Sequence, residues 1–173
     1  MIKKYYNDAP QYCHYFFNLL QSDNIIDELK RSSVITTDCL NLLNENNENL
    51  RYKENKWSVK EVIKHIIDCE RVYSYRSFRF SHFDATKLAG FDENFYIEKA
   101  KILEYSIHDL KEEYLAIRTS TIALFKGMSN EMLDFKGVAN NVSFTARTLG
   151  FMTIGHNIHH IEFIKKMYLN LEQ

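Results

Sequence analysis

Three histidines in two distant stretches of the chain have the types and spacing of a metal site. His156 and His160 are four residues apart, so in an α-helix their imidazoles lie on one face, about one turn apart, and aim at one point. A third ligand must come from another helix, and His65 is the best-placed candidate. Neutral imidazoles bind zinc, nickel and related divalent ions. The three residues therefore predict a site for one divalent metal ion per chain.

The position of His65 supports this prediction. It falls in a stripe with Val62, Cys69 and Val72 that steps by three and four residues, which is typical of a helix face that packs into a core. Taken alone, such a histidine is more often a neutral core residue bonded to a carbonyl group. Three imidazoles buried together without a cation would each leave a nitrogen in need of a partner, which favours the metal. We expect the thiol of Cys69 to be a small buried core group instead of a ligand.

Two further residues bear on whether the site is catalytic or structural. His159 points about 100° away from His160 on a helix, so we expect it to lie beside the site or at an interface. Asp68, three residues after His65, is placed to orient an imidazole or act as a base. An open coordination position that faces a cavity indicates an enzyme, whereas His159 or Asp68 as a fourth ligand indicates a structural site.

Other polar residues near the candidate ligands have simpler interpretations. We expect Glu70 to be on the solvated surface. Tyr73 and Arg76 lie two to three turns beyond His65, where a guanidinium could hold an anionic substrate, although an ion pair at the end of the bundle is the simpler role. Trp57 directly precedes a helix start and is most simply a hydrophobic staple.

A cation held by three neutral imidazoles keeps its full +2 charge and has positions left for water or an anion. It can lower the pKa of a water molecule toward ~7, for hydrolysis, or stabilise a thiolate for transfer to an electrophile. The chain has no HExxH motif, no glycine-rich phosphate loop and no strong Ser/His/Asp pattern, which excludes the usual zincin and P-loop chemistries. The alternative function is a non-catalytic, metal-stabilised bundle that acts as a stress-related dimerisation or binding module.

Helical spacing dominates the chain, which contains one proline and five glycines, so the sequence predicts an all-α fold. Ser58 followed by Glu61 is a capping-box pattern that begins one helix clearly. The connection over 83–100, with one short helix in it, indicates a long crossover instead of a tight hairpin. The four expected long helices cover residues 23–44, 58–80, 103–128 and 146–169, with the last one capped near Thr145.

Charge and cysteine content limit the partners and the compartment. The 22 Lys and Arg residues against 23 Asp and Glu residues give a net charge of −1, which predicts no nucleic-acid binding and no attraction to an anionic membrane. No signal peptide precedes the first helix and no apolar run approaches the ~20 residues that cross a bilayer, so we expect a cytoplasmic protein. Cys13, Cys39 and Cys69 are scattered, as expected of reduced thiols.

The expected organisation is one helical-bundle domain over residues 1–173. Phe163 and Tyr168, on the last expected helix, could serve a partner helix, although core packing is their more common use. We expect a homodimer on this basis.

Several motifs together resemble one family. The runs 56–71, 90–93 and 155–160, in this order and with these separations, resemble the DinB-like (DinB/YfiT-like) superfamily of metalloenzymes. The resemblance implies a four-helix bundle in up-down-down-up order with a long crossover between its second and third helices. It also implies a divalent metal, often nickel or zinc, that is held by three histidines, and these match His65, His156 and His160.

The resemblance implies a range of activities. Some relatives transfer low-molecular-weight thiols to electrophiles or isomerise small acids with the help of a thiol. By resemblance, then, the substrate is a small molecule, and the reaction is thiol transfer to a small electrophile or hydrolysis. The chain departs from its relatives in having Cys69 where another small residue is usual, and asparagine at 140 and 141 where a glycine is common.

Overall fold

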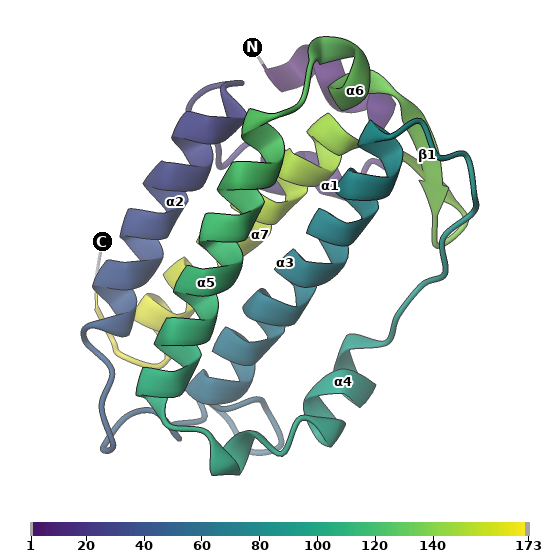
Figure 1. The fold of residues 1–173 in the computed structure, drawn as a ribbon. Coiled ribbons are helices and arrows are strands. Elements are labelled where there is room, and N and C mark those ends of the chain that lie inside the picture. Colours follow the sequence, from purple (N-terminus) through teal and green to yellow (C-terminus); the bar gives the residue numbers. More distant parts are fainter. Residues whose placement is uncertain (1, 172–173) are drawn as a thin grey trace.

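Four long helices form the body of the protein in the computed structural model, which describes residues 2–171, with every side chain in that range except that of residue 103 (Figure 1). The long helices are α2 (Ile25–Leu40), α3 (Val59–Ser81), α5 (Ile107–Lys126) and α7 (Ala146–Met167). The shorter elements are η1 (Ile2–Asp8), α1 (Cys13–Phe17), α4 (Glu93–Lys99), η2 (Ile102–Glu104), α6 (Asn130–Asp134), β1 (Lys136–Ala139) and β2 (Val142–Thr145). The four predicted long helices are confirmed, with ends that differ by a few residues.

Side-chain caps set the starts of the two helices that carry the histidines. The Ser58 hydroxyl accepts a hydrogen bond from the Glu61 N–H, and the Glu61 carboxylate accepts one from the Ser58 N–H at 2.5 Å. Thr145 accepts from the Thr148 N–H in the same way at the start of α7. These bonds satisfy N–H groups that have no partner in the first turn of a helix, so both starts are specified locally.

The direction of the helices confirms the expected bundle order. In Figure 1, α2 runs downward, α3 and α5 both run upward, and α7 runs downward again. Because α3 and α5 are parallel neighbours, the chain must return along the length of the bundle between them. It does so through the segment that carries α4 and η2. This is the predicted crossover, and it contains the predicted short helix.

Helix α7 is the most deeply buried of the four. Every residue of 146–158 is buried, and the helix packs against α1, α2 and α3. A helix that is buried on all sides must satisfy any polar group it carries by contacts inside the protein. His156 is therefore placed among other side chains and not in bulk water, whereas His159 and His160 follow this stretch and are partly buried.

A two-stranded antiparallel hairpin accompanies the helices, although helical spacing alone does not predict it. Strand β1 pairs with β2 in the register Lys136 to Thr145. Asn140 and Asn141 form the turn with φ values of 51° and 61°, a conformation that asparagine tolerates better than most residues. Leu88 donates to the Val138 carbonyl at 2.9 Å and so ties the start of the crossover to β1.

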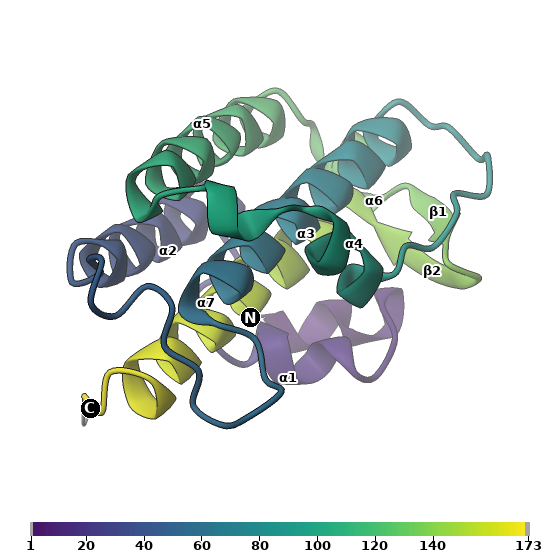
Figure 2. The same ribbon diagram turned by 90° about the horizontal axis from the view of Figure 1, so that it is seen from below.

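The segment before α2 folds back onto the bundle, which the sequence also does not predict. Figure 2 shows α1 on the side of the α3–α7 pair that faces away from α2 and α5. Helix α4 and the hairpin lie on that same side. This side of the molecule therefore has a second layer of short elements, whereas α2 and α5 complete the bundle on the other.

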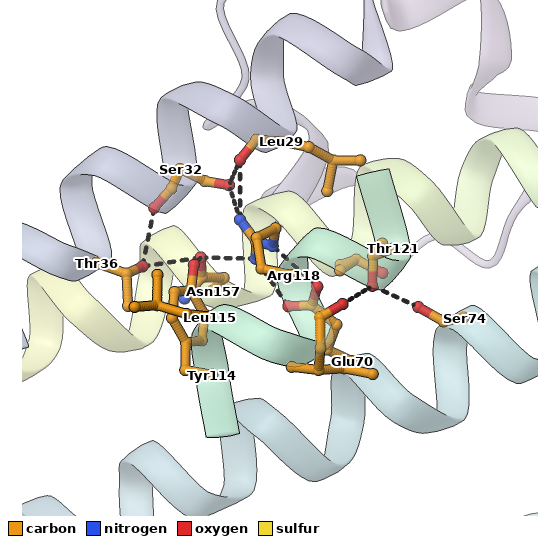
Figure 3. Close-up of polar contacts among 12 residues, drawn as sticks. Leu29, Ser32, Thr36, Glu70, Ser74, Tyr114, Leu115, Arg118, Thr121 and Asn157 are labelled. Atoms are coloured by element: carbon orange, nitrogen blue, oxygen red, sulfur yellow. Dashed lines mark hydrogen bonds and ion pairs between the residues drawn. The ribbon is translucent and has the colours of Figure 1, made fainter. Parts of the chain in front are cut away.

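A buried polar network joins all four long helices (Figure 3). Arg118 on α5 forms a two-pronged ion pair with Glu70 on α3, with both N–O distances at 2.8 Å. The same guanidinium donates to the Leu29 carbonyl on α2 and to the Asn157 side chain on α7, at 3.0 Å each. Glu70 is 2% exposed, so its expected place on the solvated surface is wrong. It lies 140° around α3 from His65, toward α5 and away from the histidines.

Candidate metal centre and cavity

The three predicted ligands meet at one point between α3 and α7. His65 Nε2 lies 3.0 Å from His156 Nε2, and His156 Nε2 lies 3.1 Å from His160 Nε2. The ring centroids of His65 and His160 are 4.9 Å apart. His156 Nε2 therefore lies within hydrogen-bond distance of one imidazole from α3 and one from the next turn of α7.

Burial keeps these imidazoles neutral. Desolvation lowers the pKa of His65 to about 4 and that of His160 to about 3. The pKa of His156 lies well below its usual value, first because of burial and then because of the neighbouring imidazoles. A neutral imidazole has a free lone pair on one nitrogen, which is the form that binds a metal.

Hydrogen bonds alone serve this cluster poorly. In a hydrogen bond between two imidazoles, one nitrogen donates and the other accepts. His156 Nε2 carries either one hydrogen or one lone pair, so it can form a good hydrogen bond with only one of its two neighbours. Three nitrogens bound to one ion at about 2.0–2.1 Å lie about 3.0–3.4 Å apart. The two distances from His156 Nε2, 3.0 and 3.1 Å, match that range, and imidazole nitrogens suit divalent ions such as zinc and nickel, so the residues present fit a divalent metal.

Cys69 gives the site a second possible set of donors. Its sulfur lies 3.6 Å from His65 Nδ1 and 3.8 Å from His65 Nε2. Donor atoms of His65, Cys69 and His156 all lie within 4.8 Å of one another. Burial raises the pKa of the thiol to about 12, as expected of the inert core thiol that the sequence predicts. A bound cation would favour the thiolate, so its role needs a direct test.

The histidines open onto a cavity of about 480 Å³. Helix α3 contributes a straight row of side chains to its wall, at intervals of four, four and three residues: His65, Cys69, Tyr73 and Arg76. The stripe predicted through Val72 therefore continues through Tyr73 instead. The remaining lining residues include Tyr12, Phe16, Trp57, Phe91, Glu93, Phe144, Leu149, Met152 and His159.

Aromatic rings hold the candidate ligands in place. The Trp57 ring packs against His65 in a tilted arrangement with the centroids 4.9 Å apart, so this residue lines the site. Tyr73 and Phe16 lie against His156, with centroid distances of 6.0 and 5.8 Å. Rings packed on several sides restrict rotation of the imidazoles and exclude water, which favours a preorganised site.

His159 and Asp68 do not close the site. His159 Nδ1 is bonded to the Tyr15 hydroxyl at 3.1 Å, so it lies beside the three histidines, as expected. The Asp68 carboxylate forms ion pairs with Lys64 at 2.7 Å and with Arg71 at 3.2 Å. The carboxylate is thus paired with cations of its own helix, and its charge raises the pKa of His65 against the larger effect of burial, so its role in orienting an imidazole stays a prediction.

The N-terminal segment forms one wall of the cavity, and Gly155 permits this contact. A Cβ atom at position 155 would lie 2.2 Å from the carbonyl oxygen of Phe16. The backbone of α1 can therefore approach α7 only where the side chain is a hydrogen atom. The aromatic run at 12–17 was the available signal for this contact, but short segments without helical periodicity rarely reveal their partner.

Substituting Gly155 with alanine is expected to displace α1 and lower the free energy of unfolding by about 1–3 kcal/mol, the usual penalty for overpacking. Urea unfolding followed by far-UV circular dichroism measures this change. Gly127→Ala is the matched control, because a Cβ there meets its nearest atom at an ordinary 3.7 Å. Equal stabilities of the two variants would contradict the proposed close approach.

The family to which this fold and site correspond is identified by comparison with known proteins. The family model described as the DinB superfamily matches residues 28–164. The chain belongs to the DinB superfamily. Among solved structures, YfiT from Bacillus subtilis is similar, with a TM-score of 0.75 and 15% sequence identity over 87% of this chain and 88% of that one. That protein is described as a probable metal-dependent hydrolase with an unusual four-helix bundle topology.

The family match begins within α2, so the DinB model does not include the N-terminal wall of the cavity. No curated protein matches the chain. Within the described residues, no helix combines the length and the apolar character that crossing a bilayer requires. The match therefore identifies the family and the bundle, while the substrate has to be inferred from the cavity.

Proposed function

We propose that this DinB protein is a metal-dependent enzyme that acts on a small molecule, with one divalent ion held by His65, His156 and His160. The observation that carries the proposal is the convergence of three neutral imidazoles on the wall of a 480 Å³ cavity. Imidazole ligands suit zinc and nickel, and we propose one of these as the metal.

A catalytic role fits the surroundings better than a structural one. A structural zinc site is closed by a fourth protein ligand, whereas a catalytic site keeps a position open for water or substrate. His159 and Asp68, whose ligation would have indicated a structural site, are bonded elsewhere. The open side of the cluster faces the cavity, which supports substrate access over the alternative of a metal-stabilised binding module.

The bound metal would supply a Lewis acid that lowers the pKa of a water or a thiol in the cavity. The chain supplies the rest of the environment. Tyr73 and Phe16 keep the ligands oriented and the site dry. His159 lies at the edge of the cavity, and burial lowers its pKa, so it is neutral near pH 7 and can accept a proton. These features suit hydrolysis of a small substrate.

A second cavity supports thiol transfer as the other candidate reaction. It measures about 400 Å³ and shares Trp57, His159 and His160 with the first. Two cavities that meet at one site can hold two substrates, a low-molecular-weight thiol and an electrophile. In such a transfer the thiolate sulfur forms a bond to the electrophilic carbon, and the leaving group departs with the bonding electron pair.

The expected result that tests the proposal is a metal content of about one ion per chain, measured by elemental mass spectrometry on purified protein. His65→Ala, His156→Ala and His160→Ala should each lose the metal, because two imidazoles hold a divalent ion far more weakly than three. His108→Ala is the control, since His108 is exposed on α5.

Cys69→Ala distinguishes the two donor sets. We expect this variant to keep its metal, and we expect the cobalt-substituted natural protein to lack the charge-transfer absorption of a thiolate ligand. Metal lost in Cys69→Ala but kept in His160→Ala would replace the three-histidine set. No metal in the natural protein, after incubation with nickel, zinc and manganese, would overturn the proposed function.

The homodimer stays a prediction. The two residues that suggested it are used within the chain: Tyr168 is buried and donates to the Trp57 carbonyl at 2.7 Å, and Phe163 packs against Tyr52 and Tyr168. The cytoplasmic location likewise stays a prediction.

A further inference from the structure

Arg76 places a buried positive charge in the wall of the cavity. Its side chain is 5% exposed, and it lines the same cavity as the three histidines. One guanidinium nitrogen donates to the Ala89 carbonyl at 2.9 Å, and the group lies 5.6 Å from the centre of the Phe91 ring. The backbone of the crossover and an aromatic ring thus hold the charge in a fixed place.

No carboxylate neutralises this charge among residues 2–171. The structure describes three buried arginines, and the other two each have a two-pronged carboxylate partner: Arg118 has Glu70, and Arg147 has Asp134 at 2.6 and 2.9 Å. Arg76 has only the carbonyl and the ring. A buried charge without a counter-charge is strongly unfavourable unless a ligand supplies one. The expected ion pair at the end of the bundle is therefore wrong, and the guanidinium is available to an anion.

The geometry of α3 relates this charge to the candidate metal centre. Arg76 follows His65 by eleven residues, which is three turns, so both side chains lie on one face with their Cα atoms about 16 Å apart along the axis. Both side chains line the same cavity. A molecule of several carbon atoms can therefore contact both ends.

The lining residues indicate the chemistry of that molecule. Arg76 is the only lysine or arginine among the lining residues that the structure describes, which fits a singly charged group. The planar guanidinium fork matches the two oxygens of a carboxylate. Between Arg76 and the histidines the wall is largely aromatic and apolar, with Tyr12, Phe16, Tyr73 and Met152. Glu93 is the one carboxylate in the wall; it is exposed to solvent.

We infer that the substrate of this enzyme is a small monocarboxylate with an apolar or aromatic body, whose carboxylate binds Arg76 while its other end reaches the three histidines. The inference rests on the proposed metal-dependent function and names the substrate class for the same site. Tyr12 and Phe16 contact the body of the substrate from the N-terminal segment, which lies outside the family match. The N-terminal segment is therefore a source of specificity in this cavity.

Isothermal titration calorimetry with phenylacetate and phenylacetamide tests the inference, because the two probes have similar size and differ in charge. We expect the natural protein to bind phenylacetate at least about tenfold more tightly than phenylacetamide, the minimum for hydrogen bonds to a charged group. This comparison needs no variant, so it stands even where a substitution disturbs folding. Equal affinities, or no binding of either probe, would overturn the inference.

Three variants locate the anion. Arg76→Gln is expected to lose at least about tenfold in phenylacetate affinity and to leave phenylacetamide unaffected. Arg76→Lys keeps the charge but lacks the planar fork, so its affinity for phenylacetate should lie between those of the natural protein and Arg76→Gln. Arg79→Gln removes a neighbouring cation on α3 that pairs with Asp84 at the surface, and it should bind phenylacetate like the natural protein.

The same titrations on protein stripped of metal by a chelator separate this inference from the proposed function. We expect Arg76-dependent binding of phenylacetate to persist without metal. Binding that disappears with the metal and survives in Arg76→Gln would mean that the carboxylate binds the metal, which overturns the role of Arg76 and leaves the metal-dependent function intact. The proposed metal-dependent function is tested separately, by elemental analysis of the natural protein.

Discussion

Replacing Arg118 with methionine is expected to lower the free energy of unfolding by about 3–5 kcal/mol, the usual effect of removing one partner of a buried ion pair. The guanidinium is 1% exposed and contacts α2, α3 and α7 from its place on α5. Without it, the Glu70 carboxylate remains buried without a cation, and the Leu29 carbonyl loses a donor. Urea unfolding of metal-free protein, followed by circular dichroism, measures the loss.

Arg71→Met is the matched control for Arg118→Met. It removes an arginine that also joins α3 to α5, through Glu113 at 2.6 Å, but its side chain is 43% exposed. A surface pair of this kind contributes about 0–1 kcal/mol. The double variant Glu70→Leu/Arg118→Met should recover much of the loss, because it removes both charges. A loss in Arg118→Met no larger than that in Arg71→Met would show that the network contributes little to stability.

The buried pair also shows the limit of reading the sequence alone. Helical spacing and the caps at Ser58 and Thr145 are local, so they predict the long helices and their starts well. Glu70 was misplaced because its environment depends on which helix packs across from it. That helix is α5, brought beside α3 by the crossover, and its arginine lies 48 residues along the chain. Local patterns do not carry that information.

Some features of the candidate site can likewise be predicted from local patterns, and others cannot. His65, His156 and His160 could be predicted because two of them share a helix face and the third lies in a core stripe, and both features are periodic. The roles of Arg76 and of the N-terminal wall could not be predicted. The missing carboxylate beside Arg76 and the close approach of Phe16 to Gly155 depend on the tertiary structure. What the sequence misses is therefore the shape and charge of the cavity, which decide the substrate more than the metal ligands do.

Acid is expected to destabilise the metal-free protein progressively below about pH 6.5 because of its three neutral histidines. In the unfolded chain a histidine takes up its proton near pH 6.5, whereas burial lowers the pKa of His65 to about 4 and of His160 to about 3. Between these values the unfolded state binds more protons, so stability is full above about pH 6.5 and falls as the pH falls. His65 alone would contribute a loss of about 3 kcal/mol by pH 4.

Because these imidazoles contact one another, the loss belongs to the cluster and not to each residue separately. Against a total stability of about 5–15 kcal/mol, we expect a drop of at least about 2 kcal/mol between pH 6.5 and pH 5, measured by urea unfolding. The triple variant His65→Gln/His156→Gln/His160→Gln cannot take up these protons, so its stability should fall much less over the same range. Saturating zinc should move the loss to lower pH, because metal and protons compete for the same lone pairs. An equal pH dependence in the natural and triple-variant proteins would mean that the histidines are not buried as neutral groups, and a metal site built from them would lose its physical basis.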